Sequence, residues 1–186
     1  MTTPPTQRTR PETRRAPSIV LVNTGDGKGK TTAAMGTVLR ALARGWRVCV
    51  VQFVKSGRWH SGEVRLLSEL GAEWHVTGDG FTWDADDLDH SADLARAAWA
   101  LAKQSIESGR FDVVLLDEIT YPINWGWIDE ADVTGTIASR PAKVNVIVTG
   151  RNASEGLVSV ADTVSEVRKV KHAFDAGIRA AKGIDF

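Results

Sequence analysis

The sequence predicts an α/β fold in which a mainly parallel sheet is flanked by helices. The first observation behind this prediction is that short apolar strand patterns alternate with helical patterns along the chain, which is typical of βαβ units. The second is a glycine-rich stretch, residues 24–32, that lies between an apolar run and a helical pattern. The third is an apolar run, residues 113–116, that ends in two acidic residues.

Each predicted element follows from the spacing of its apolar residues and from the glycines at its ends. Apolar or alternating runs predict strands over residues 19–22, 47–53, 73–76, 112–117, 144–149 and, more weakly, 163–167. Helical spacing predicts helices over residues 33–42, 62–70 and 94–106. Parallel strands end at one edge of a sheet, where ligands bind. We therefore expect the glycine stretch, the acids at 117–118 and Thr149-Gly150-Arg151 to share one rim.

The glycine stretch has the composition of a phosphate-binding P-loop. Glycines let successive backbone N–H groups point at one anion, and the N-terminus of the following helix adds partial positive charge. Lys30 can reach a phosphate oxygen and the Thr31 hydroxyl can bind Mg²⁺. We therefore expect ATP and a P-loop NTPase-like (RecA-like) fold. The alternative is a flexible glycine turn, since the strict pattern has glycine where this chain has Thr24. The predicted binding residues are Gly25, Asp26, Gly27, Lys28, Gly29, Lys30, Thr31 and Thr32.

Asp117 and Glu118 follow a buried strand and resemble a Walker B pair. Mg²⁺ prefers oxygen ligands and keeps several waters, so Thr31 and one carboxylate would suffice to bind it. The spacing does not decide which acid binds the metal directly. The alternative is that these acids cap the following helix.

Two groups of aromatic residues lie in predicted loops. Phe81 and Trp83 stand in a stretch rich in Gly and Asp, where bulky apolar side chains are exposed unless they bind something or anchor the loop to the core. Tyr121, Trp125 and Trp127 follow the acidic pair. This second group could pack against a large flat ligand or lie in the core under a loop, and the sequence favours neither.

Composition narrows the remaining possibilities. The formal net charge is zero, which does not support nucleic-acid binding. No membrane span or secretory signal is expected, and the single cysteine fits a reducing cytoplasm. The four histidines are dispersed and stand in no ligand spacing with Cys49, so the sequence predicts no zinc site. Residues 1–17 hold four of the six prolines and are rich in arginine, which predicts a disordered arm before a single domain over residues 18–186.

The chain resembles the P-loop type of ATP:corrinoid adenosyltransferase from about residue 18 to the end. The family shares the non-glycine first position of the loop, here Thr24. The matching segments are residues 24–34, 51–55, 80–83, 116–121, 149–151, 161–167, 170–178 and 183–185.

This resemblance implies a specific reaction, in which cobalt(I) of a corrinoid attacks the 5′ carbon of ATP and triphosphate leaves whole. It implies that Lys30 binds phosphate, that Thr31 and Glu118 hold Mg²⁺ (Mn²⁺ is also possible), and that Phe81 and Trp83 wall the lower face of the corrin. The nucleotide would lie reversed in the loop compared with ordinary P-loop ATPases. A flavoprotein reductant and a homodimer are also implied.

A different class of protein also fits part of the sequence. A P-loop ATPase that acts as a switch or regulator would explain the glycine loop and the acidic pair. It would leave Phe81, Trp83 and the C-terminal segment unexplained. A phosphotransferase should carry a cluster of lid arginines, and the sequence shows none.

Overall fold

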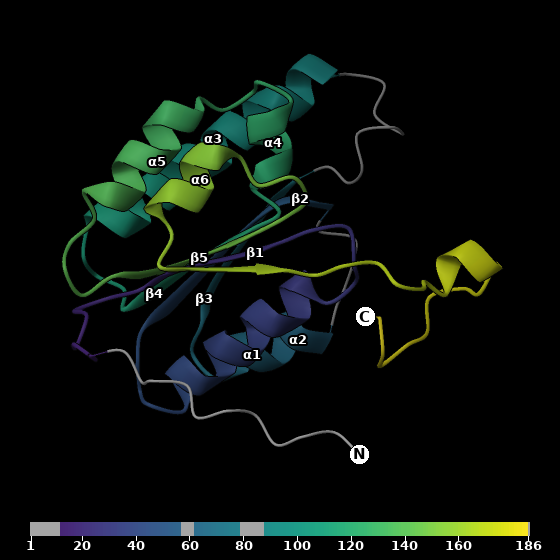
Figure 1. The fold of residues 1–186 in the computed structure, drawn as a ribbon, viewed down its shortest axis with the longest axis horizontal. Helices are drawn as coiled ribbons and strands as arrows, with labels where there is room; N and C mark the ends of the chain where they lie inside the picture. Colours follow the sequence, from purple (N-terminus) through teal and green to yellow (C-terminus); the bar gives the residue numbers. More distant parts are fainter. Residues whose placement is uncertain (1–11, 57–61, 79–87, 186) are drawn as a thin grey trace.

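The computed structural model of the chain contains a six-stranded, entirely parallel sheet with helices on both faces (Figure 1). The structure describes residues 12–56, 62–78 and 88–185. Across the sheet the strand order is β3-β2-β4-β5-β1-β6. The strands are β1 (Val20–Thr24), β2 (Val48–Ser56), β3 (Glu73–Gly78), β4 (Val113–Asp117), β5 (Asn145–Thr149) and β6 (Thr163–Glu166). The helices are α1 (Lys30–Leu42), α2 (Gly62–Glu69), α3 (Leu88–Glu107), α4 (Thr120–Asn124), α5 (Glu130–Ala138), α6 (Glu155–Val160) and the 3₁₀ turn η2 (Phe174–Ala176).

The helices divide into two layers because the strands are apolar on both faces. Helices α1 and α2 cover one face of the sheet, and α3, α4, α5 and α6 cover the other (Figure 1). Alternate residues of β2 enter separate cores: Cys49 and Val51 face the α3 layer, whereas Val48 and Val50 face α1. Central strand β4 is buried at every position, as expected for a parallel strand between two helical layers. The α/β class predicted from the sequence is therefore confirmed.

Each strand predicted from the sequence is present, and three short helices were not predicted. Helix α4 has five residues and contains Pro122, so it offers no helical period to detect. Helices α5 and α6 do carry a readable signal. The side chains of Asp129 and Ser154 accept hydrogen bonds from the backbone N–H groups of Ala131 and Leu157 and so cap the two helices.

The C-terminal segment leaves the sheet after β6 and runs past the carboxyl ends of the strands (Figure 1). All four residues of β6 have exposed side chains. Within the described residues, β6 is an edge strand that pairs with β1. Beyond β6, large apolar side chains remain exposed at Val170, Phe174, Ile178 and Ile184. No helix in the described part of the chain has the length and apolar character needed to cross a bilayer.

Candidate functional site: a phosphate cradle at the carboxyl edge of the sheet

The glycine stretch forms a loop between β1 and α1 whose backbone requires glycine. Gly25 and Gly29 have φ angles of 97° and 120°, in the region that residues with a Cβ rarely adopt. Gly29 occupies the N-cap position of α1, and Lys30 and Thr31 begin the helix. The loop thus delivers both side chains to the N-terminal end of a helix, where the backbone favours anions.

The loop is held from its far side by the chain that follows β6. The N–H of Gly27 donates to the carbonyl of Val167 at 2.6 Å, and the N–H of Val167 donates to the carbonyl of Thr24 at 2.8 Å. A Cβ built on Gly25 or Gly27 would lie 2.6 or 2.7 Å from the Val167 carbonyl oxygen. The glycines therefore serve a close backbone approach as well as the shape of the loop.

Replacing Gly27 with alanine should distort the loop, because its new Cβ would also lie 2.8 Å from a side-chain carbon of Val167. We expect a loss of about 2 kcal/mol in the free energy of unfolding, typical of an overpacked site, together with weaker ATP binding. The matched control is Gly36→Ala within α1, where a Cβ meets nothing within 4 Å. That control should leave binding unchanged and raise stability by up to about 1 kcal/mol. Denaturant unfolding measures the free energy of unfolding, and a nucleotide titration measures ATP affinity. Equal changes of both quantities in Gly27→Ala and Gly36→Ala would contradict the packing argument.

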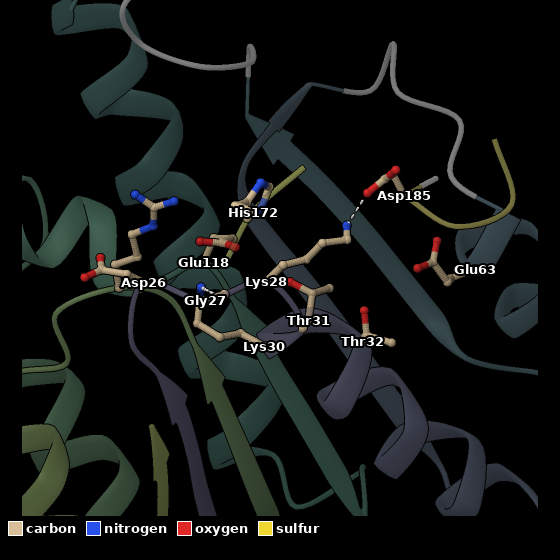
Figure 2. Close-up of a pocket in the computed structure, with 12 residues that line it drawn as sticks. Asp26, Gly27, Lys28, Lys30, Thr31, Thr32, Glu63, Glu118, His172 and Asp185 are labelled. Carbon is tan, nitrogen blue, oxygen red and sulfur yellow. Dashed lines mark hydrogen bonds and ion pairs between the residues drawn. The ribbon is translucent and has the colours of Figure 1, made fainter. Parts of the chain in front are cut away.

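A cavity of about 210 Å³ opens above the loop at the carboxyl edge of the sheet. Figure 2 shows the side chains of Lys30, Thr31 and Glu118 gathered around it. The rim predicted from the sequence is therefore assembled. Gly25 packs against the Val167 backbone and the Glu166 side chain and is not among the lining residues, whereas the other predicted loop residues line the cavity. The lining residues are Asp26, Gly27, Lys28, Gly29, Lys30, Thr31, Thr32, Glu63, Glu118, Arg151, His172 and Asp185.

Lys30 is a buried cation within the loop. Its side chain is 7% exposed, and its Nζ donates a hydrogen bond to the carbonyl of Gly27 at 2.7 Å. Desolvation lowers the pKa of the Lys30 ammonium from its usual value, and the nearby Glu118 carboxylate partly offsets that shift. The Lys30 ammonium has lost part of its hydration and donates a hydrogen bond to the Gly27 carbonyl, so it is suited to bind an anion in the cavity.

Asp117 lies under the cavity and organises the groups around it. It is fully buried, and its Oδ1 accepts hydrogen bonds from the hydroxyls of Thr31 at 2.9 Å and Thr149 at 2.7 Å. Its Oδ2 accepts from the Gln52 side-chain amide at 2.8 Å. The Gln52 carbonyl oxygen in turn accepts from Trp74 Nε1 at 3.1 Å. These bonds fix the Thr31 side chain from below.

Glu118 directs its carboxyl group toward the cavity from a left-handed backbone conformation. Its φ is 65°, which is uncommon for a residue with a side chain. Its N–H donates to the Thr149 hydroxyl at 2.9 Å, which anchors this turn at the end of β4. Glu118 and Thr31 both line the cavity and offer a carboxylate and a hydroxyl oxygen. Such hard oxygen ligands suit Mg²⁺, so the donor set fits the metal that the sequence predicted.

Four lining residues were not among the predicted site residues. Arg151 follows β5 and was expected at this rim from its position after a strand end, although no binding role was assigned to it. Glu63 comes from α2, and His172 and Asp185 come from the C-terminal segment. Asp185 forms an ion pair with Lys28 at 2.5 Å, and this partner lowers the pKa of the Asp185 carboxyl.

Of the two groups of aromatic residues, only the second lies within the described residues. Phe81 and Trp83 fall within 79–87, outside the described residues, so their expected contact with a ligand stays a prediction. Tyr121, Trp125 and Trp127 are partly buried and pack against the core on the α3 side of the sheet. The Trp125 ring lies 5.5 Å from Tyr121 and 4.7 Å from Trp127 between centroids. Of the two alternatives for this second group, the structure supports the core role.

Comparison with known proteins identifies relatives over nearly the whole chain. Residues 17–186 match the family model described as ATP:corrinoid adenosyltransferase BtuR/CobO/CobP. The chain is 45% identical to the corrinoid adenosyltransferase of Escherichia coli strain K12, over 90% of this chain and 85% of that protein. It is 44% identical to corrinoid adenosyltransferase CobA of Salmonella typhimurium, with the same coverage. The corrinoid adenosyltransferase of Pseudomonas aeruginosa is 42% identical, over 90% of this chain and 83% of the relative.

Proposed function

Because the chain belongs to the BtuR/CobO/CobP family of ATP:corrinoid adenosyltransferases, we propose that it transfers the 5′-deoxyadenosyl group of ATP to cobalt(I) of a corrinoid. The carbon–oxygen bond at the 5′ position breaks, cobalt supplies the electron pair of the new cobalt–carbon bond, and triphosphate leaves. The product is an adenosylated corrinoid such as adenosylcobalamin. The protein is accordingly a transferase.

The observation that carries this proposal is the buried Lys30 ammonium within a glycine cradle that also presents Thr31 and Glu118. Cobalt(I) is already a strong nucleophile, so the reaction asks the protein for orientation and for stabilisation of the departing triphosphate. Lys30 and the N-terminus of α1 would bind the phosphates, and Arg151 supplies a second cation at the cavity. Thr31 and Glu118 would hold Mg²⁺, or Mn²⁺ in its place. When bound, the metal neutralises charge on the triphosphate.

Other parts of the proposal derive from the family resemblance. The nucleotide would lie reversed in the loop so that its 5′ carbon faces the corrinoid. Phe81 and Trp83 would cover the lower face of the corrin and exclude an axial ligand, which makes reduction to cobalt(I) easier. A flavoprotein would supply the electron, and the enzyme would act as a homodimer. A cytoplasmic location stays a prediction.

Replacing Glu118 with glutamine should raise the Mg²⁺ concentration needed for half-maximal activity by about tenfold or more, because a neutral amide is a weaker ligand. The fold should be retained, since the two side chains have the same shape. A titration of activity against Mg²⁺ measures this, with Glu63→Gln as the control for loss of another carboxylate at the same cavity. An unchanged Mg²⁺ dependence in Glu118→Gln would exclude Glu118 as the metal ligand.

The reaction products distinguish adenosyl transfer from the ATPase-switch alternative. We expect triphosphate in equal amount to adenosylated corrinoid when the protein is incubated with ATP, Mg²⁺ and chemically reduced corrinoid. An ATP analogue with a non-hydrolysable β–γ bridge should still donate its adenosyl group, because that bond is never cut. Release of ADP and orthophosphate in equal amount to ATP consumed, and inhibition by the analogue, would contradict the proposal and support the switch.

A further inference from the structure

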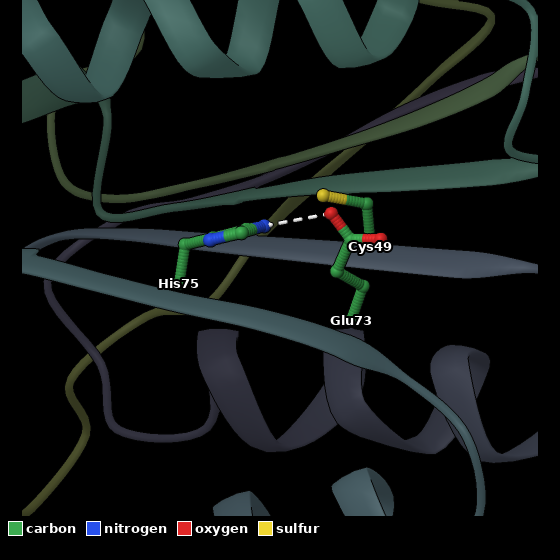
Figure 3. A group of neighbouring side chains, drawn as sticks. All are labelled: Cys49, Glu73 and His75. Atoms are coloured by element: carbon green, nitrogen blue, oxygen red, sulfur yellow. Dashed lines mark hydrogen bonds and ion pairs between the residues drawn. The ribbon is translucent and has the colours of Figure 1, made fainter.

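A cluster of cysteine, glutamate and histidine side chains lies at the opposite end of the strands from the phosphate cradle. Figure 3 shows Cys49, Glu73 and His75 grouped on neighbouring strands β2 and β3. The sheet register pairs Cys49 with Glu73 and Val51 with His75, and side chains two residues apart share one face of a strand. The thiol sulfur, a carboxylate oxygen and an imidazole nitrogen all lie within 4.8 Å of one another.

This cluster was not predicted from the sequence because its members are separated in the chain. Cys49 stands 24 residues before Glu73, and no short ligand spacing links it to a histidine. Parallel strand pairing brings them together. Glu73 and His75 lie on an edge strand, β3, and their side chains are partly exposed, whereas Cys49 is fully buried. A ligand could therefore enter from the edge and reach the buried sulfur.

Neighbouring residues already orient two of the three groups. Arg110 Nη2 lies 2.9 Å from each carboxylate oxygen of Glu73. Within the cluster His75 Nε2 lies 3.0 Å from Glu73 Oε1, and a bound metal would replace this contact. The Cys49 sulfur lies 3.7 Å from the hydroxyl of Ser105 on α3. Hydrogen bonds of this kind from outside a metal site hold its ligands in place and tune their basicity.

We propose that Cys49, Glu73 and His75 form a binding site for a divalent transition metal of the zinc class. A thiolate, an imidazole and a carboxylate are the ligand types that zinc combines, and a site with three protein ligands leaves the fourth position for water. The thiolate selects against Mg²⁺ and Ca²⁺, which prefer oxygen. One thiolate and one carboxylate balance the 2+ charge, so Arg110 can keep its ion pair with the outer carboxylate oxygen.

A cavity adjoins the cluster on the side of Glu73. Its volume is about 280 Å³, and it is lined by Glu73, Ser105 and Arg110, together with other residues of α3. The bound metal would join the edge strand β3 to the inner strand β2 and lie near the C-terminal end of α3. Its expected role is structural, since the cluster lies at the amino-terminal end of β2 and β3 and the phosphate cradle lies at the carboxyl edge.

Cobalt(II) is a suitable probe because it takes the place of zinc and is coloured. The full-length chain, freed of any histidine tag, should develop a cobalt–thiolate charge-transfer band and the strong visible bands of four-coordinate cobalt on titration with Co²⁺, and excess Zn²⁺ should bleach both. Cys49 is the sole cysteine of the sequence, so the charge-transfer band can arise from no other residue. Metal held by the phosphate cradle would have oxygen ligands and lacks this band.

Variants of Glu73 and His75 test whether the metal is bound by all three side chains or by the Cys49 thiol alone. His75→Gln and Glu73→Gln should each weaken Co²⁺ binding at least tenfold, as expected for loss of one of three ligands. His90→Gln, on the exposed start of α3, is the matched control and should bind as the parent does. Absence of the charge-transfer band in the folded parent chain, or its survival at unchanged affinity in the double variant His75→Gln/Glu73→Gln, would overturn the proposal.

Thermal unfolding gives a readout that does not involve catalysis. Zn²⁺ at a hundredfold excess over its Kd should raise the Tm of the parent and of His90→Gln by roughly 5–10 °C. Cys49→Ala, a small change at a buried position, should show no such rise. A Zn²⁺ effect of equal size in Cys49→Ala would place the metal elsewhere and contradict the assignment.

Discussion

Replacing Lys30 with alanine should lower kcat/KM by roughly 100-fold or more while leaving the protein folded. The loss corresponds to about 3 kcal/mol of transition-state stabilisation, the scale seen when one preorganised charge or donor is removed from an active site. The Lys30 Nζ donates a hydrogen bond to the carbonyl of Gly27 at 2.7 Å and lies in a desolvated environment. Its charge is therefore available to the departing triphosphate, and its removal relieves a buried cation.

The matched control for this prediction is Lys28→Ala in the same loop. The Lys28 side chain is 48% exposed and pairs with Asp185 at the rim, so solvent screens its charge. We expect a loss of only a few fold in kcat/KM for this variant. Steady-state kinetics with chemically reduced corrinoid, alongside circular dichroism and denaturant unfolding, compare the two. Similar losses in both variants, or near-normal turnover by a folded Lys30→Ala protein, would be inconsistent with the role assigned to Lys30.

Replacing Asp117 with alanine should reduce both stability and activity. The change removes the acceptor for two hydroxyls and one amide in a fully buried place, and leaving such donors unsatisfied costs about 3 kcal/mol or more in total. That is a large part of the stability of a typical domain, about 5–15 kcal/mol. Activity should also fall in the fraction that folds, because the Thr31 hydroxyl loses the bond that orients it.

A second variant and a surface control make this result interpretable. In Asp117→Asn, one oxygen can still accept from both threonine hydroxyls, but the new amide faces the amide of Gln52. We therefore expect a smaller loss of unfolding free energy than in the alanine variant. Asp93→Ala removes a 74% exposed aspartate paired with Arg96 and should change stability by less than about 1 kcal/mol. Equal stability of the Asp117→Ala protein and this control would refute the network argument.

The fold was predictable because apolar runs mark buried parallel strands directly. Strands β1, β4 and β5 are nearly continuous apolar sequences, and the rule that ligands bind beyond their carboxyl ends placed the glycine loop, Glu118 and Arg151 at one edge. The spacing of the sequence did not distinguish the positions of Asp117 and Glu118, and only the family resemblance implied Glu118 as the metal ligand. Their positions depend on the left-handed backbone at Glu118 and on which hydroxyls surround Asp117, and both are properties of the folded chain.

The other unpredicted features share a physical cause, which is contact between residues far apart in the chain. Val167 meets the glycine loop across more than 100 residues, and strand register joins Cys49 to Glu73. No local periodicity encodes either contact. Short helices such as α4 were not predicted for a local reason: five residues are too few to display a helical period.

The bonds between Gly27, Val167 and Thr24 couple the phosphate loop to the least protected strand of the sheet. Strand β6 has one described neighbour and no buried side chain, so it should open locally at a lower free energy than the central strands. Each opening would release the Gly27 and Val167 amides together, and hydrogen exchange should show these two protons exchanging at the same rate. Triphosphate bound in the loop would then slow exchange at a segment 140 residues away in the chain. Part of the free energy of nucleotide binding would therefore serve to keep strand β6 paired with β1.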